Sequence, residues 1–330
     1  MAALLDFALF AGKAFILVLA ALALAAGLAA LARRGRESGH LEVRPLDRHL
    51  RKMEYTLRHA LFGRAQFRAQ LKAQRKADKS RLKNDGPRVF VLGFEGDLRA
   101  TRVDQLREEI TALLTLADPA RDRVVVRVES GGGLVHGYGL AAAQLARVRE
   151  RGIPLTVTVD KIAASGGYMM AAVADRIVAA PFAVVGSIGV VAQIPNVHRL
   201  LKRNDVDVEL LTAGQYKRTL TVFGENTDEG RAKFQEELET AHALFQRFLQ
   251  RYRPQLDLER LATGEHWFGE EALELQLVDE LGTSDDLLLQ LAAEARVFEL
   301  RFVRRQPMGK RLTLAFESAV ERWLGTTSRP

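Results

Sequence analysis

The chain has 330 residues, of which 48% are hydrophobic, and this suffices for one large domain with accessory segments. It contains no cysteine, which excludes disulfide bonds, thiolate metal sites and a cysteine nucleophile. The net charge of +7 is concentrated in residues 33–86, which hold 16 Lys/Arg against 6 Asp/Glu. Such a local basic segment favours a position beside anionic lipid and disfavours a nucleic-acid-binding domain.

The N-terminal region is predicted to be a membrane anchor over residues 1–32. Residues 14–32 form a run of 19 residues without a charge, long enough to cross a bilayer as a helix. A cleaved signal peptide is the alternative, because Ala-Leu-Ala triplets resemble cleavage sites. The length of the run, Asp6 before it and the sequence RRGR after it favour a retained anchor.

Residues 33–87 are predicted to be a basic juxtamembrane segment. Leucines and phenylalanines at loose helical spacing over residues 51–83 indicate an interfacial helix, with a charged linker as the alternative. The sequence NDGP at residues 84–87 is typical of a turn and marks a domain boundary.

Residues 88–305 are predicted to be the main domain, and residues 306–330 an amphipathic C-terminal tail. Apolar, strand-like runs alternate with helical patterns, which predicts an α/β fold with a parallel sheet and crossover helices. The predicted strands are 88–94, 123–130, 154–160, 175–181, 184–191, 206–213 and 297–303. The predicted helices are 101–117, 134–151, 165–174, 196–204 and 228–253.

Two of these strands end in glycine-rich turns, at residues 131–133 and 165–167. The carboxyl ends of parallel strands meet at one edge of a sheet, where ligands bind. Ser165 would there present its hydroxyl beside the free N–H groups of a helix start, as a nucleophile needs. The alternative is a packing turn whose serine only caps the helix. A dinucleotide loop is disfavoured, because the G-x-G-x-x-G spacing and a P-loop lysine are missing.

A serine nucleophile needs a base. His136, His198 and His266 lie nearest to the predicted site, but none has a recognisable partner residue in the sequence. A lysine can also serve, since burial lowers the pKa of a lysine and favours its neutral form. Lys217 follows an apolar run, although a lysine in this position is usually a surface charge.

Several motifs together resemble the signal peptide peptidase A family of membrane-bound serine proteases, in particular its SohB branch. They are ESGGGLVHGYGLAAAQL, VDKIAASGGYMMAAVADRIVAAPFAVVGSIGVVAQ, LLTAGQYKRTLTVFGEN and ATGEHWFG. The resemblance implies a Clp/crotonase-like α/β fold, a Ser–Lys dyad and assembly into rings. Carried over by position, Ser165 would be the nucleophile, Lys217 the general base, and Ser187 the residue that orients the lysine.

The resemblance also implies an oxyanion hole made by the N–H of Gly166 together with that of Gly132 or Gly133. The chain departs from the family at Gly131, where the family usually has proline. Loss of the fixed φ of proline gives this loop more freedom before substrate binds.

These features predict a membrane-anchored serine endopeptidase that cuts hydrophobic peptides, such as signal-peptide remnants or misfolded membrane segments, through an acyl-enzyme. We expect no cofactor and no metal, a homo-oligomer, and the lipid bilayer and peptides as partners, but no nucleic acid. The alternatives are a crotonase-type acyl-CoA enzyme, which has the same fold, and a catalytically silent membrane scaffold.

The resemblance implies a bacterial inner-membrane protein whose catalytic domain lies in the periplasm. The positive-inside rule, applied to Arg33, Arg34 and Arg36, predicts the cytoplasm instead. Long domains translocate despite such charges, so we expect the periplasmic side.

Overall fold

The computed structural model describes residues 39–63 and 86–304, together with Phe15, Val18 and Leu19. It separates into two compact units, residues 1–42 with 302–330 and residues 43–301. The predicted C-terminal tail and nearly all of the predicted anchor lie outside the described residues. Within the described part, no helix combines the length and the hydropathy that crossing a membrane requires.

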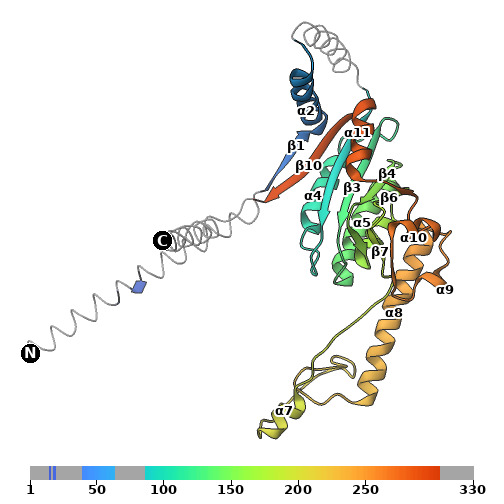
Figure 1. Ribbon diagram of the computed structural model, residues 1–330. Coiled ribbons are helices and arrows are strands. Elements are labelled where there is room, and N and C mark those ends of the chain that lie inside the picture. The colour runs from blue at the N-terminus through green and yellow to red at the C-terminus, as the bar shows by residue number, and fades with distance from the viewer. Residues whose placement is uncertain (1–14, 16–17, 20–38, 64–85, 305–330) are drawn as a thin grey trace, which may run out of the picture. The chain divides into compact units, whose positions relative to one another are not determined.

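A central sheet organises the fold, with the strand order β1-β10-β2-β3-β4-β6-β9 (Figure 1). The five strand pairs from β10 to β9 all run parallel. This confirms the predicted α/β class with a parallel sheet. The strands are β1 (Gly39–Pro45), β2 (Arg88–Glu95), β3 (Asp122–Glu129), β4 (Leu155–Val159), β6 (Arg176–Ala179), β9 (Glu280–Leu281) and β10 (Arg296–Arg304).

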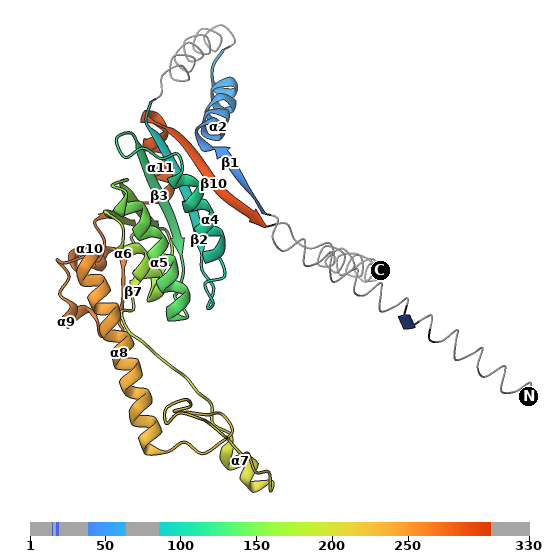
Figure 2. The same cartoon turned by 180° about the vertical axis from the view of Figure 1, so that it is seen from behind.

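Helices cover both faces of the sheet (Figure 2). Because side chains alternate along a strand, Phe90, Leu92 and Phe94 of β2 face one apolar cluster, while Val89 and Val91 face the other. The larger cluster contains residues from α4 (Val103–Leu114), α5 (Val135–Glu150), α6 (Gly166–Ala172) and α8 (Asp228–Tyr252). The smaller cluster contains residues from α11 (Ser284–Glu294).

The predicted basic juxtamembrane segment is described over residues 39–63, where it contains β1 and α2 (Leu46–Leu61); residues 64–85 lie outside the described residues. Leu46 packs against the smaller apolar cluster. The sequence GHLEVRP of β1 is too polar to be recognised as a strand from its composition, so the sheet begins earlier in the chain than expected.

A second, small sheet positions the predicted nucleophile. It has the order β5-β7-β8 and comprises β5 (Ile162–Ala164), β7 (Val184–Gly186) and β8 (His266–Phe268). A bridge between Ser130 and Ala163 joins β5 to the end of β3. This sheet therefore lies next to the carboxyl end of β3, where the first glycine turn begins.

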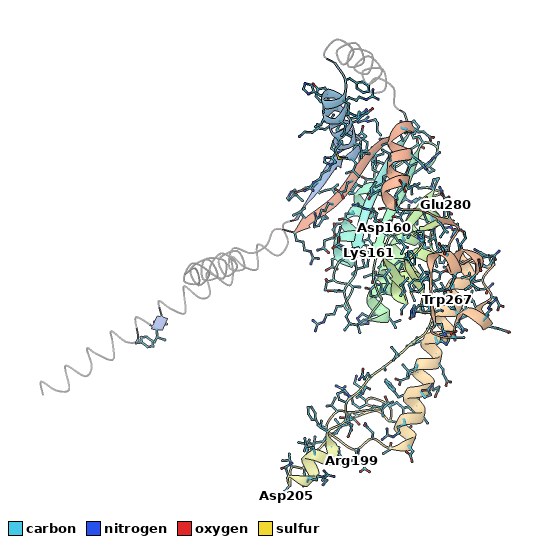
Figure 3. All side chains as sticks on the ribbon, in the orientation of Figure 1. Asp160, Lys161, Arg199, Asp205, Trp267 and Glu280 are labelled. Carbon is cyan, nitrogen blue, oxygen red and sulfur yellow. The ribbon has the colours of Figure 1, made fainter. Side chains whose placement is uncertain are left out.

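Residues 190–227, which we call the arm, contain the single short helix α7 (His198–Arg203) (Figures 1 and 3). The strand predicted at residues 206–213 is wrong, because this segment is not paired with any described strand and Leu211 is 90% exposed. The arm contacts the N-terminal turns of α8, where Lys233 lies over the ring of Tyr216. Only Phe245 and Leu249 of α8 are buried, so the first half of this helix stands clear of the core.

The remaining elements close the domain near the small sheet. They are α9 (Leu258–Leu261), which is capped by Asp257, and α10 (Gly269–Glu274). Arg253 follows α8 and is 3% exposed; its guanidinium donates two hydrogen bonds of 2.8 Å to the carboxylate of Asp279. This pair ties the end of α8 to the segment before β9.

Candidate active site

Ser165 occupies a strained turn between β5 and α6. Its φ is +50°, in the left-handed region that few residues other than glycine adopt. Ser165 is the residue before the first turn of α6, yet its side chain makes no capping hydrogen bond. The capping alternative is therefore excluded for this conformation. Its backbone N–H donates to the carbonyl of Gly186 at 2.7 Å, and its partly exposed hydroxyl is left for other chemistry.

The first glycine turn packs directly against this serine. A Cβ on Gly132 would lie 2.7 Å from Cβ of Ser165 and 2.8 Å from the amide nitrogen of Gly166. Gly132 also has a φ of +89°, which side-chain-bearing residues rarely adopt. The structure thus brings the two glycine-rich turns together, as the sequence analysis expected.

The N–H of Gly132 is already occupied, because it donates to Oγ of Ser130 at 3.1 Å. Within the described part of the chain, the N–H groups of Gly133 and Gly166 donate to no protein acceptor. Gly166 opens α6, so its N–H has no partner within the helix. Of the two glycines left open by the sequence, Gly133 is therefore the better candidate to join Gly166 in an oxyanion hole.

Ser187 directly follows β7, as Ser165 directly follows β5. Ala164 pairs with Gly186 in parallel register, so Ser165 and Ser187 are the next residues at the ends of adjacent strands. Ser187 also has a positive φ, +51°, and its N–H donates to the carbonyl of Glu265 at 2.6 Å. A Cβ on Gly186 would lie 2.7 Å from the ring of Trp267 on β8, which is labelled in Figure 3. The ring therefore packs directly against Gly186, the residue before Ser187.

Lys217 lies in the arm and is exposed, so the burial expected from the sequence is not found within the single chain. Its backbone N–H donates to the carbonyl of Gly214. Two residues earlier, the side-chain amide of Gln215 donates to the carboxylate of Glu229 on α8 at 3.3 Å. Among the described residues, no hydrogen bond or ion pair joins Lys217 to Ser165 or Ser187. The structure thus brings Ser165, Ser187 and the glycines together but leaves the predicted base on the arm.

Among the described residues, none of the three histidines considered as alternative bases is hydrogen-bonded to Ser165. His136 and His266 are exposed. His198 lies on α7, where its Nδ1 is 3.3 Å from the carbonyl oxygen of Phe223. The described residues thus contain no hydrogen-bonded triad of Ser165 with any of these histidines.

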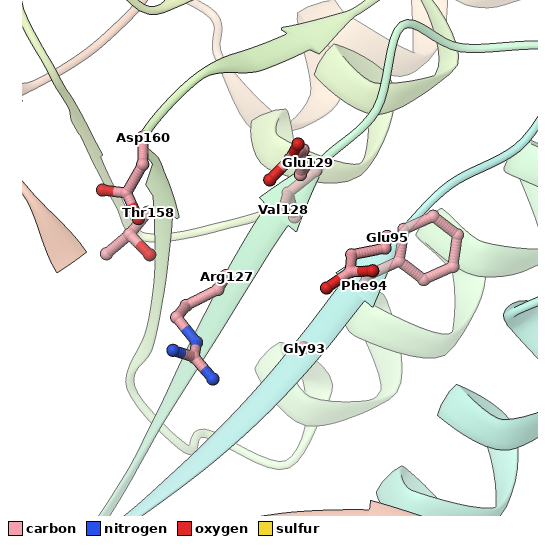
Figure 4. Close-up of a pocket in the computed structure, with 8 residues that line it drawn as sticks. All are labelled: Gly93, Phe94, Glu95, Arg127, Val128, Glu129, Thr158 and Asp160. Atoms are coloured by element: carbon pink, nitrogen blue, oxygen red, sulfur yellow. The ribbon is translucent and has the colours of Figure 1, made fainter. Parts of the chain in front are cut away.

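A polar cavity of about 170 Å³ lies at the ends of β2, β3 and β4, but Ser165 does not line it (Figure 4). Most of its charged groups are paired with protein partners. Glu129 accepts from Lys161 at 2.9 Å, Arg127 donates to Glu299 at 2.8 Å, and Asp160 accepts from the backbone N–H and hydroxyl of Ser284. We therefore assign this cavity a structural role.

Sequence reasoning missed two residues beside the glycine turns, Ser130 and Tyr138. Both are buried, and their hydroxyl oxygens are 2.5 Å apart. Ser130 directly precedes the three glycines, which was a usable signal. Tyr138 gave none, because an aromatic residue in a helix is usually part of the core.

Two family models together match most of the chain. "Peptidase family S49 N-terminal" matches residues 2–145, and "Peptidase family S49" matches residues 147–298. Among solved structures, a mutant of the 1510-N membrane-bound stomatin-specific protease covers 63% of this chain and 85% of its own, at 14% identity. Its TM-score of 0.36 is too low to support an argument.

Curated relatives are much more similar. "Probable protease SohB" of Haemophilus influenzae is 58% identical over 233 residues, which are 70% of this chain and 66% of that protein. The protein with the same name from Buchnera aphidicola subsp. Acyrthosiphon pisum is 56% identical over 232 residues, 70% of this chain and 69% of its own length. The matches thus span about two thirds of these relatives. The chain belongs to peptidase family S49, in the branch whose curated members are named probable protease SohB.

Proposed function

We propose that this peptidase is a serine endopeptidase in which Ser165 is the nucleophile. The observation that carries the proposal is the conformation of Ser165: a strained residue at the start of α6 whose hydroxyl does not cap the helix. A fold keeps such strain where function needs it, and Gly132 packs against this serine so closely that no side chain fits there.

In the proposed reaction, Oγ of Ser165 attacks the scissile carbonyl carbon while the uncharged amine of Lys217 takes the hydroxyl proton. The carbonyl oxygen becomes an oxyanion, to which the N–H groups of Gly166 and Gly133 donate. The intermediate collapses when the leaving amine takes the proton from Lys217, and an acyl-enzyme remains. Water then attacks the ester, again with Lys217 as base, and releases the second product and Ser165.

This mechanism requires that the arm bring Lys217 to a serine. The arm and α8 carry large exposed apolar side chains, which a second copy of the chain would cover. They include Val191, Leu200, Leu211, Phe223 and Leu244. We propose that the chain is a homo-oligomer in which the arm of one copy supplies its lysine to Ser165 of a neighbouring copy.

For the substrates, we propose hydrophobic peptides such as signal-peptide remnants or segments of misfolded membrane proteins. The uncharged run at residues 14–32 and the basic residues that follow support a bilayer anchor, which would hold the active site where such peptides arise. We propose an inner-membrane location with the catalytic domain in the periplasm. Proteolysis of spheroplasts tests this side directly, because full protection of the domain would contradict it.

The experiment that tests the function measures hydrolysis of a hydrophobic fluorogenic peptide by the full chain in detergent. We expect turnover by the wild type and a loss of about 10³-fold or more for Ser165→Ala and Lys217→Arg. An acyl-CoA thioester is the comparison substrate for the crotonase alternative. Efficient thioester conversion without peptide cleavage, or peptide cleavage by Ser165→Ala, would contradict the proposal.

A further inference from the structure

Beside the glycine turns, a buried set of hydrogen bonds connects the loops after β2 and β3 to α5. The hydroxyl of Tyr138 donates to the carbonyl of Asp97 at 2.8 Å and lies 2.5 Å from Oγ of Ser130, which accepts from the N–H of Gly132 at 3.1 Å. Ser130 is 2% exposed and Tyr138 is fully buried. We propose that Ser130 and Tyr138 are positioning residues that hold the glycine turn in the geometry of an oxyanion hole. The inference rests on the proposed function of Ser165.

The direction of each hydrogen bond follows from the donors that are present. The carbonyl of Asp97 can only accept, so the hydroxyl of Tyr138 donates its one hydrogen bond to this carbonyl. The short contact between the hydroxyls then requires Ser130 to donate to Tyr138. The remaining lone pairs of Ser130 face the N–H of Gly132. This order turns the N–H of Gly132 toward Ser130 and leaves Gly133 as the loop donor for an oxyanion.

The ring of Tyr138 also holds Gly166, whose N–H is the second proposed donor to the oxyanion. A Cβ on Gly166 would lie 2.3 Å from Cγ of this ring, so the ring supports the first residue of α6 directly. On the opposite side, a Cβ on Gly96 would lie 2.4 Å from the Tyr138 hydroxyl and 2.5 Å from Oγ of Ser130. Glycine at positions 96 and 166 thus lets one tyrosine reach both halves of the site.

The loop needs such an anchor because of its own sequence. Residues 131–133 are three consecutive glycines, and flexible backbone loses the most freedom when it is ordered. Burial raises the pKa of Tyr138, which keeps the phenol protonated and able to donate at neutral pH. The hydrogen bonds from Tyr138 and Ser130 thereby hold the turn before substrate arrives.

The chain offers a matched pair of variants. Tyr138→Phe removes the hydroxyl that anchors the glycine turn. Tyr168→Phe removes the hydroxyl of another fully buried tyrosine, on α6, which donates to the carbonyl of Leu277 at 2.8 Å and not to the turn. Both variants lose one buried hydrogen bond to a carbonyl, and Tyr138→Phe also loses the bond with Ser130. Their thermal unfolding shows whether stability explains any change in activity.

The measurement is kcat and KM on the hydrophobic peptide, with the inhibition constant of a peptide aldehyde whose hemiacetal oxygen would occupy the oxyanion hole. Removing an oxyanion donor costs about 10²–10³ in kcat, so displacing one should cost about 10- to 100-fold. We expect Tyr138→Phe to lower kcat and aldehyde affinity by this factor, with KM within about twofold. For Tyr168→Phe we expect both within about twofold of wild type at neutral pH.

Ser130→Ala provides the second test, because it removes the acceptor of the Gly132 N–H without touching the tyrosine ring. Its kcat and aldehyde affinity should match those of Tyr138→Phe. The double variant should have a kcat no lower than that of the less active single variant, since the two residues act as one unit. Equal kcat for Tyr138→Phe and Tyr168→Phe, with wild-type kcat for Ser130→Ala, would overturn the inference alone. A wild type that neither cleaves the peptide nor binds the aldehyde would instead overturn the proposed function.

Discussion

Gly132 and Ser165 lie so close together that a Cβ on Gly132 would be 2.7 Å from Cβ of Ser165. The two residues come from different turns, one after β3 and one after β5, and the bridge between Ser130 and Ala163 joins these segments. The contact therefore depends on the relative position of both turns that form the site. It also explains why a glycine is needed at this position, since the same residue has a φ of +89°.

Gly132→Ala should lower peptide hydrolysis by at least about 100-fold, because its methyl group would displace Ser165 or the N–H of Gly166. Gly131→Ala is the matched control in the same turn. A Cβ there would meet only Cδ1 of Ile162, at an ordinary 3.8 Å. We expect its kcat within about threefold of wild type. Similar losses for both variants would argue against a specific role for Gly132.

The strain at Ser165 predicts a trade-off between stability and activity. Ser165→Ala and Ser165→Gly should both be inactive, but the glycine variant relieves the positive φ of +50°. We expect Ser165→Gly to be more stable than Ser165→Ala by about 1 kcal/mol in denaturant unfolding. An alanine variant as stable as the glycine variant would show that the turn is not strained.

The central strands and their crossover helices could be predicted because each strand is a nearly continuous apolar run. β3, for example, has the sequence DRVVVRVE and is buried on both faces. The segment 206–213 has the same apolar character but meets no neighbouring strand, and hydrogen-bonded partners, not composition, decide whether a strand forms. The strands β5 and β8 have three residues each, too few for a periodic pattern, yet they position Ser165.

The proximity of Ser165 and the two glycine turns could be predicted because their backbone requirements are local and visible in the sequence. The support from Tyr138 could not, since only the fold brings it against Gly166. The place of Lys217 could not be predicted either. Its burial would depend on contacts that the single chain does not make.

If the lysine comes from a neighbouring copy, mixed oligomers should regain activity. Ser165→Ala keeps an intact Lys217, and Lys217→Ala keeps an intact Ser165. Co-assembly of equal amounts should restore about one quarter of wild-type turnover, the share of contacts that join an intact serine to an intact lysine. A mixture as inactive as its parts, although light scattering shows mixed oligomers, would place the lysine and the serine of each site in one chain.

Buried tyrosines predict a loss of stability at high pH. Burial raises the pKa of Tyr168 in the folded state, whereas an exposed tyrosine in the unfolded chain titrates near 10. The folded state thus holds a proton that the unfolded state releases, so the free energy of unfolding is unaffected below about pH 10 and falls above it.

The expected size of this effect is up to about 1.4 kcal/mol per pH unit for one tyrosine. Tyr168→Phe should make the slope shallower by the contribution of this one tyrosine in denaturant unfolding measured from pH 9 to 11, while Tyr138 keeps its own contribution. Tyr216→Phe is the control, because it removes a tyrosine hydroxyl that is not buried: Tyr216 is 46% exposed. Parallel pH profiles for wild type and Tyr168→Phe would contradict this account.

The most direct test of the nucleophile is to map the residue that a fluorophosphonate modifies in the full-length protein. Mass spectrometry of the digested adduct should place the label on Ser165, with no label on Ser165→Ala and much slower labelling of Lys217→Ala. Ser187 lies at the end of the adjacent strand and is the internal comparison. Label on Ser187 or another residue, or a Ser165→Ala protein that still hydrolyses the peptide, would contradict the assignment of Ser165 as the catalytic nucleophile.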